Sequence, residues 1–219
     1  MFQLTSPVLL CEITASFMGI AMDRFSLQTF VKICLMDTGG RIAEIQRKLE
    51  SASGYDFYNS FYRATRAYCE DKASDEPSVI LEAPVKDTER KYNKDAFEAF
   101  KEKFGSSKSL VSIKRQKLYV PEGANFEISI DPLFGVEKAS VKYAYLPRAM
   151  QKPELTQRYA AVACFIMRQA YKGTNLSNWQ FNTYDFTKGK SYSENMINDK
   201  TPKILLSDAR TISTLLVDL

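Results

Sequence analysis

No histidine occurs in the 219 residues of this chain. Histidine is the side chain that titrates near neutral pH, and it is the commonest ligand of transition metals in proteins. Its absence excludes a Ser-His-Asp triad, a Cys-His pair and every zinc site that needs an imidazole. Any catalysis would therefore depend on carboxylates, Lys, Tyr or Cys, most simply around a cation that oxygen atoms hold.

Cysteine is sparse as well. The four cysteines are far apart in the sequence and form no Cys-x-x-Cys pair: Cys11, Cys34, Cys69 and Cys164. A secreted domain held together by disulfides has its cysteines packed into a shorter chain. We therefore expect these thiols to be reduced and mostly buried.

Long apolar runs are also missing. No Lys or Arg precedes Arg24, and Glu12 interrupts the apolar residues near the start. A signal peptide begins with basic residues, and a membrane-spanning helix needs about 20 apolar residues. The sequence therefore predicts no membrane segment and, by default, a cytoplasmic location.

The composition that remains is that of an ordinary globular protein. Hydrophobic residues make up 45% of the chain and charged residues 26%, and the net charge is +4. Val8 to Met22 suits either a strand or a helix, apolar residues fall at helical spacing in the later part of residues 1–72, and residues 73–94 are mainly polar. We predict an α+β protein with a helical N-terminal segment (1–72), a polar connection (73–94) and a mixed core with a C-terminal helix (95–219).

The pattern changes from helical to alternating after Gly105. Alternation of apolar and polar residues is typical of half-buried strands, and Pro and Gly mark where they stop. In order, the sequence predicts a helix over 95–104, strands over 110–120, 126–131 and 139–146, a helix from Pro153 to about Tyr171, a strand over 180–187, and a last helix that Ser207 caps.

Two short motifs lie on the predicted strands. Ile130-Asp131-Pro132 ends the second strand, and Ser140-Val141-Lys142 begins the third. With the α-β-β-β-α-β order, they resemble the core of the PD-(D/E)XK, or restriction-endonuclease-like, superfamily over about residues 95–187. The resemblance implies that Asp131 holds Mg²⁺ or Mn²⁺ and that Lys142 helps to orient or activate the attacking water.

The motif departs from the family at one position. Ser140 stands where the family carries a second metal-binding carboxylate, and Glu154, near the following helix, would supply the missing acid as in some members. The resemblance thus implies Asp131, Lys142 and Glu154 as catalytic residues, with Asp131 and Glu154 as metal ligands. The chain either hydrolyses phosphodiesters with them or keeps a degenerate core that only binds.

Basic residues are concentrated in the same part of the chain. Between Lys138 and Tyr184 there are seven Lys or Arg residues and a single acid, Glu154. Such a concentration of positive charge is what binding to phosphates requires. We expect four basic residues to bind DNA or RNA: Arg115, Lys117, Arg148 and Arg158.

A function of another class stays open. Phe57, Phe61 and Tyr68 form an aromatic stripe at helical spacing. Such a stripe is usually core, but it would also suit a protein-interaction or regulatory module, an inhibitor or assembly factor, that binds a protein partner through its N-terminal helices. Salt separates the two: binding to phosphates weakens steeply as salt rises, and an apolar interface does not.

Overall fold

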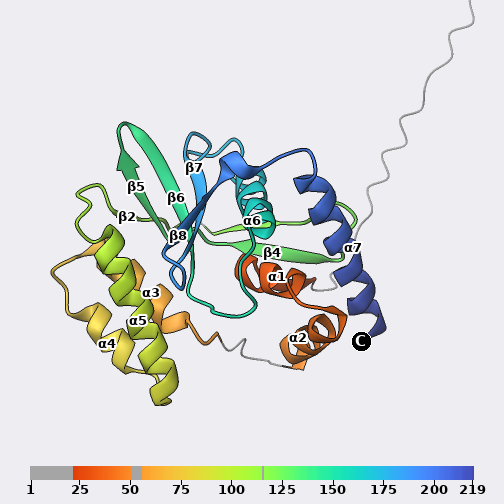
Figure 1. The fold of residues 1–219 in the computed structure, drawn as a ribbon, viewed down its shortest axis with the longest axis horizontal. Coiled ribbons are helices and arrows are strands. Elements are labelled where there is room, and N and C mark those ends of the chain that lie inside the picture. The colour runs from red at the N-terminus through yellow and green to blue at the C-terminus, as the bar shows by residue number, and fades with distance from the viewer. Residues whose placement is uncertain (1–21, 51–55, 115) are drawn as a thin grey trace, which may run out of the picture.

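A computed structural model describes residues 22–50, 56–114 and 116–219 of the chain (Figure 1). It confirms the predicted mixture of helices and strands, with the strands in two sheets. The helices are α1 (Leu27–Cys34), α2 (Thr38–Glu50), α3 (Asn59–Glu70), α4 (Glu76–Glu82), α5 (Asp87–Phe104), α6 (Gln157–Ala170), α7 (Thr201–Asp218) and the short 3-10 helix η1 (Glu194–Met196). The strands are β1 (Asp23–Ser26), β2 (Val111–Ser112), β3 (Lys117–Tyr119), β4 (Phe126–Ile130), β5 (Phe134–Lys138), β6 (Val141–Arg148), β7 (Gln180–Asp185) and β8 (Lys190–Ser193).

The larger sheet has five strands in the order β2-β5-β6-β7-β8. Its pairs are antiparallel except β6 with β7, which run parallel because α6 connects them. Successive side chains of a strand point to opposite faces. Ala144 and Leu146 accordingly join the core around α6, whereas Tyr145 joins the core formed with α3 and α5.

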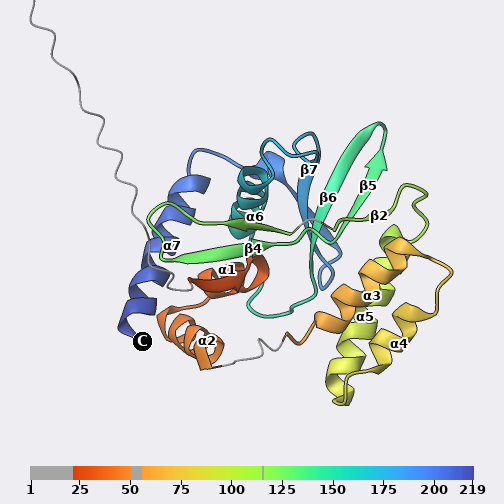
Figure 2. The same cartoon turned by 180° about the vertical axis from the view of Figure 1, so that it is seen from behind.

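The core beside α3 and α5 is rich in aromatic side chains. Phe61, Phe100 and Phe134 are fully buried in it, and the ring centres of Phe100 and Phe134 lie 5.0 Å apart. Figures 1 and 2 show α3, α4 and α5 together on one side of the molecule, away from α1, α2 and α7. Of the predicted aromatic stripe, Phe61 is fully buried in this core, whereas Phe57 and Tyr68 are partly buried against it.

The polar segment 73–94 contains α4 and the start of α5. The segment predicted as a polar connection is thus largely helical, and α4 buries Ile80 and Leu81 on its apolar side. The aromatic core also takes residues from both sides of this segment. The predicted N-terminal segment includes residues 1–21 and 51–55, which lie outside the described residues.

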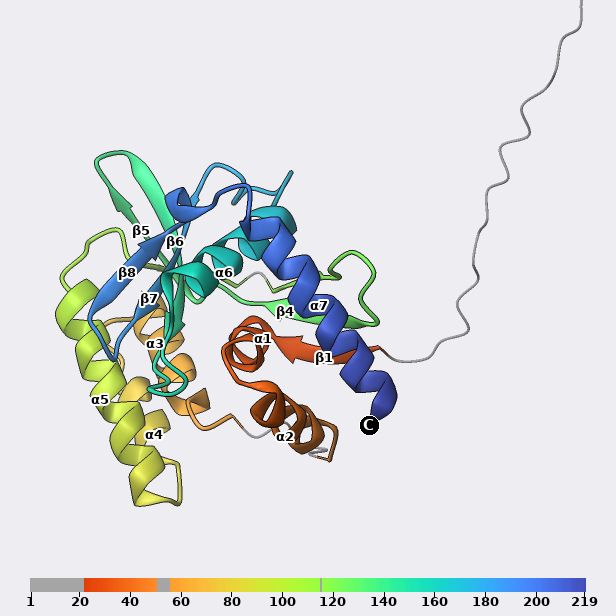
Figure 3. The same cartoon turned by 45° about the vertical axis from the view of Figure 1, so that its right-hand side comes forward.

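The smaller sheet has the strand order β1-β4-β3. β1 runs parallel to β4, and β3 runs antiparallel to it. Figure 3 shows α1 and β1 between α2 and β4. Ser26 ends β1 and caps α1, because its Oγ accepts a hydrogen bond from the Thr29 N–H at 3.1 Å.

Three predicted strands differ from the structure. The predicted strand 110–120 is divided between β2 in the larger sheet and β3 in the smaller one. The predicted second core strand is β4, which lies in the smaller sheet, and β6 pairs instead with β5, which was not predicted. Ala139 and Ser140 have φ angles of 48° and 65°, so they form the turn of the β5–β6 hairpin and not the start of a strand.

Two predicted helix starts are also displaced. α6 begins at Gln157 rather than Pro153, with Thr156 as its cap. α7 begins at Thr201, with Pro202 in its first turn, so Ser207 lies within the helix and does not cap it.

The cysteine prediction is confirmed for two of the thiols. Cys34 and Cys164 are buried, and burial raises the pKa of the Cys164 thiol to about 12. Cys69 is partly buried, and Cys11 lies outside the described residues. Among the described helices, none is both long and apolar enough to cross a membrane.

Candidate functional site

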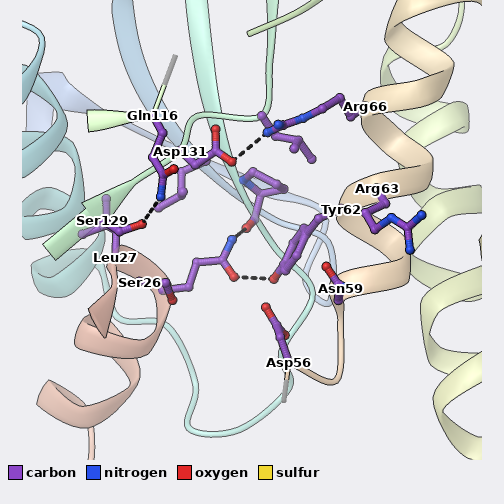
Figure 4. Close-up of a pocket in the computed structure, with 14 residues that line it drawn as sticks. Ser26, Leu27, Asp56, Asn59, Tyr62, Arg63, Arg66, Gln116, Ser129 and Asp131 are labelled. Atoms are coloured by element: carbon purple, nitrogen blue, oxygen red, sulfur yellow. Dashed lines mark hydrogen bonds and ion pairs between the residues drawn. The ribbon is translucent and has the colours of Figure 1, made fainter. Parts of the chain in front are cut away.

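A pocket of about 290 Å³ opens where α1 and α3 approach the ends of β4 and β6 (Figure 4). Asp131, the residue that follows β4, is part of its wall. The wall combines polar and apolar surface and draws residues from five separate stretches of the chain: Ser26, Leu27, Gln28, Asp56, Asn59, Tyr62, Arg63, Arg66, Gln116, Ser129, Asp131, Leu133, Leu146 and Pro147.

Asp131 forms an ion pair with Arg66 of α3. Arg66 Nη2 lies 2.7 Å from Asp131 Oδ2, and the two side chains are 32% and 40% exposed. At this exposure water and salt screen the ion pair, so it adds little to stability. The ion pair matters more for the chemistry of Asp131, because the Arg66 guanidinium group already binds one oxygen of its carboxylate.

A second arginine faces the same pocket. Arg63 precedes Arg66 by three residues, and side chains at this spacing lie on one side of a helix. Arg63 is exposed and, like Arg66, lines the pocket, but in Figure 4 its guanidinium group points away from Asp131, whereas that of Arg66 points toward it. Guanidinium groups donate hydrogen bonds in a fixed, planar pattern that suits phosphate and carboxylate oxygens.

Neutral side chains that form hydrogen bonds line the pocket between α1 and the two arginines. Gln28 Nε2 donates to the Pro147 carbonyl oxygen at 2.8 Å, and the Tyr62 hydroxyl donates to Gln28 Oε1. Burial raises the pKa of Tyr62 well above its usual range, so this hydroxyl stays protonated. Across the pocket, Gln116 Nε2 donates to Ser129 Oγ at 2.7 Å.

The structure does not bring Lys142 to Asp131. Lys142 lies near the hairpin turn, opposite Glu137 on β5, and its Nζ is 5.9 Å from the centre of the Trp179 ring. Ser140 lies in the turn itself, so it does not occupy a strand position beside Asp131. The residues of β6 that share the pocket with Asp131 are Leu146 and Pro147, which have no ligand atom in their side chains.

Glu154 is also away from the pocket. Its side chain is 70% exposed, and its Oε2 lies 2.8 Å from Lys188 Nζ in the turn after β7. The hydrogen bond from Lys188 lowers the pKa of Glu154. Glu154 and Asp131 therefore have separate partners, and the described part of the chain contains no group of three or more His, Cys, Asp or Glu residues arranged to hold a metal.

The predicted nucleic-acid contacts have different surroundings. Arg148 is 3% exposed, and burial lowers its pKa. Its Nη2 donates to the Pro153 carbonyl oxygen, and its Nε has no partner in the described structure. Arg148 is therefore buried in the described structure, and its guanidinium group is not on the surface where the prediction would need it.

The remaining predicted basic contacts that the structure describes lie on different elements. Lys117 lies on β3, at an edge of the smaller sheet, whereas Arg158 is exposed on α6 with its guanidinium carbon 5.6 Å from the centre of the Tyr159 ring. Arg115 lies outside the described residues. The site residues that the sequence reasoning missed are Arg63, Arg66 and Gln116, and the only signal for the arginines was their spacing on the polar side of α3.

No family model matches this sequence, and no curated protein matches it. A solved structure described as "Crystal structure of SSO0001" aligns over 84% of this chain and 82% of its own, with 11% sequence identity and a TM-score of 0.27. A TM-score this low carries no argument about the fold or the function of this chain.

Proposed function

We propose that the protein binds nucleic acid through its phosphates at the pocket around Arg63 and Arg66, and that it does so without cleaving the chain. The observation that carries the proposal is the ion pair of Arg66 with Asp131. In this ion pair the Arg66 guanidinium group binds the Asp131 carboxylate, which a nuclease of the resembled family would use to bind its metal ion. A second arginine and several amide and hydroxyl groups complete the wall.

The order of elements supports the link to nucleic acid. Between α5 and α6 the chain forms β2, β3, β4, β5 and β6. Of these, β2, β5 and β6 are neighbours in the larger sheet together with β7, whereas β3 and β4 belong to the smaller sheet. Asp131 comes shortly before β5, the second strand of this set. The resemblance to the restriction-endonuclease-like superfamily is based on 126–131 as the second core strand, but that strand is β4 of the smaller sheet, so the larger sheet matches the family's order only if β5 takes its place.

The absence of a cleavage step follows from the ligand chemistry. Mg²⁺ and Mn²⁺ need several oxygen ligands around one point. Asp131 is engaged by Arg66, and the other carboxylate of the wall, Asp56, lies at the opposite end of the pocket in Figure 4 and accepts the Tyr58 N–H at 3.0 Å. Leu146 and Pro147 stand where a second ligand would be needed. Binding is thus proposed to be independent of these cations.

The test measures binding and cleavage together. Labelled single- and double-stranded DNA and RNA are incubated with the protein in Mg²⁺, in Mn²⁺ and in EDTA, and the Asp131→Asn variant is assayed in parallel. We expect binding that weakens steeply with salt, no cleavage, and no effect of EDTA. Metal-dependent cleavage that Asp131→Asn abolishes would overturn the non-cleaving assignment. A wild-type protein that binds none of these nucleic acids would overturn the function itself.

A further inference from the structure

A second hollow lies next to the pocket. It has a volume of about 230 Å³ between α1, α2, the start of α3 and the segment after β6. Asp56 belongs to the walls of both, and Thr29 of the second hollow follows Gln28 of the first. The two hollows are therefore neighbours on one side of the protein. The second is lined by Thr29, Lys32, Glu44, Arg47, Lys48, Asp56, Phe57, Tyr58, Met150 and Lys152.

The second hollow has an excess of positive charge. Glu44 is 7% exposed, and Lys32 Nζ lies 2.7 Å from its Oε2 while Arg47 binds its other oxygen. Burial alone would raise the pKa of Glu44, but the hydrogen bonds from Arg47 and Lys32 hold this pKa below its usual value. Lys48 and Lys152 complete the cationic part of the wall and form no ion pair with another described residue.

Together the two hollows carry more positive charge than either carries alone. The first contains two arginines and two aspartates, which balance. With the second, the walls hold six cationic side chains against three carboxylates. The excess lies at the end formed by α2 and the segment after β6, so phosphates bound at Arg63 and Arg66 would continue toward Lys48 and Lys152.

Aromatic side chains lie between these cations. Tyr62 belongs to the wall of the first hollow, and Phe57 and Tyr58 belong to that of the second. Phe57 is only partly buried, and its ring centre is 5.0 Å from that of Tyr58. A base of an unpaired strand can stack on such a ring, whereas the bases of a duplex are stacked on one another.

We infer that the two hollows form one path for single-stranded nucleic acid. Arg63 and Arg66 hold the phosphates at one end, Lys48 and Lys152 hold those of the nucleotides beyond, and Phe57 supports a base between them. This inference rests on the proposed function. It adds a length requirement, because a strand that fills only the first hollow does not reach Lys48 or Lys152.

The test is a series of oligonucleotide lengths. Fluorescence anisotropy gives the affinity for single strands of about 4 and about 16 nucleotides, and for a duplex of the longer one. The variants are Lys48→Ala/Lys152→Ala and Arg63→Ala/Arg66→Ala. The control, Lys91→Ala/Arg210→Ala, removes the same charge from exposed positions on α5 and α7. Circular dichroism verifies that each variant is folded.

We expect Lys48→Ala/Lys152→Ala to weaken binding of the longer strand about tenfold, to reduce its salt slope by about 0.7 for each phosphate that the variant no longer neutralises, and to leave the short strand unaffected. Arg63→Ala/Arg66→Ala should weaken both lengths, and the control should weaken neither. An unchanged affinity of Lys48→Ala/Lys152→Ala for the longer strand would overturn the path but leave the proposed function standing. Tighter binding of the duplex would overturn the single-stranded assignment, and no binding by the wild type would overturn both proposals.

Discussion

The two ends of the β5–β6 hairpin have very different surroundings. At its open end, Asp131, Leu146 and Pro147 meet side chains from α1 and α3, and a polar pocket forms. At its turn, Ala139 and Ser140 are exposed, and Lys142 lies opposite Glu137 on the neighbouring strand. The difference shows that a functional site here needs helices that converge on the strands. The motif along β6 lies at the turn, where Lys142 is near Glu137 and the Trp179 ring, and it does not form a site with Asp131.

The largest expected effect is a loss of stability when the packing of the β5–β6 hairpin is disturbed at Gly135. A Cβ atom at Gly135 would lie 2.2 Å from Cζ3 of Trp179 and 3.1 Å from the Tyr143 carbonyl oxygen. Because the ring would have to move out of a packed position, Gly135→Ala should lower the free energy of unfolding by about 1–3 kcal/mol. Urea denaturation measures this change. Gly39→Ala is the control, since a Cβ there meets nothing closer than 3.9 Å; equal stability of the two variants would contradict the prediction.

Removal of two positive charges at either end tests which end binds nucleic acid. Arg63→Ala/Arg66→Ala should weaken binding about tenfold, which corresponds to about 1.4 kcal/mol, and lower the salt dependence. Lys138→Ala/Lys142→Ala removes the same charge near the turn and should leave affinity unchanged. Electrophoretic mobility shifts at several salt concentrations give both quantities. Equal losses in the two variants would mean that only the net charge matters.

A smaller effect of opposite sign is expected at Asp131. Asp131→Asn removes a negative charge from the pocket and frees Arg66, so affinity for nucleic acid should rise about threefold, which corresponds to about 0.7 kcal/mol. Stability should change by less than about 1 kcal/mol, because the ion pair is partly exposed. Glu137→Gln near the turn is the matched control and should not alter the affinity. A loss of affinity in Asp131→Asn would show that the carboxylate itself takes part in binding.

The smallest effect is expected at Glu154. Its carboxylate pairs only with Lys188 in the described structure and lies outside the pocket. Glu154→Gln should therefore leave affinity, and its independence of Mg²⁺, unchanged in the same titrations. A Mg²⁺-dependent change in the affinity of Glu154→Gln would instead show that Glu154 is a metal ligand, as the resemblance implies. Asp131 and Glu154 would then no longer differ in role.

Local signals explain which elements could be predicted from the sequence. The alternation of apolar and polar residues in β4 matches its burial, and the helical spacing over 95–104 lies within α5. β5 escaped prediction because it follows Pro132 and contains Gly135, which weaken a strand signal. Its pairing with β6 and the Trp179 ring packed over Gly135 stabilise it instead, and these contacts come from distant residues.

The candidate site shows the same limit. Asp131 could be proposed because it follows a clear strand and precedes Pro132. Its partner could not, since Arg66 is 65 residues away and nothing near either residue signals the contact. Arg148 was misjudged for a related reason: a basic residue at a strand end is usually exposed, but here the packing around it excludes water.

The pairing of β1 with β4 has a consequence for the order in which the chain folds. The ion pair of Arg24 with Glu127 joins residues 103 apart, across the pair of strands. Contacts this distant in sequence form slowly, because a long loop must close before they stabilise anything. During synthesis β1 would remain unpaired, and Phe25, which is buried in the folded protein, would be exposed to solvent until residues near 130 have left the ribosome. The smaller sheet is thus a late-forming unit, and the nascent chain most needs protection from aggregation before β4 emerges.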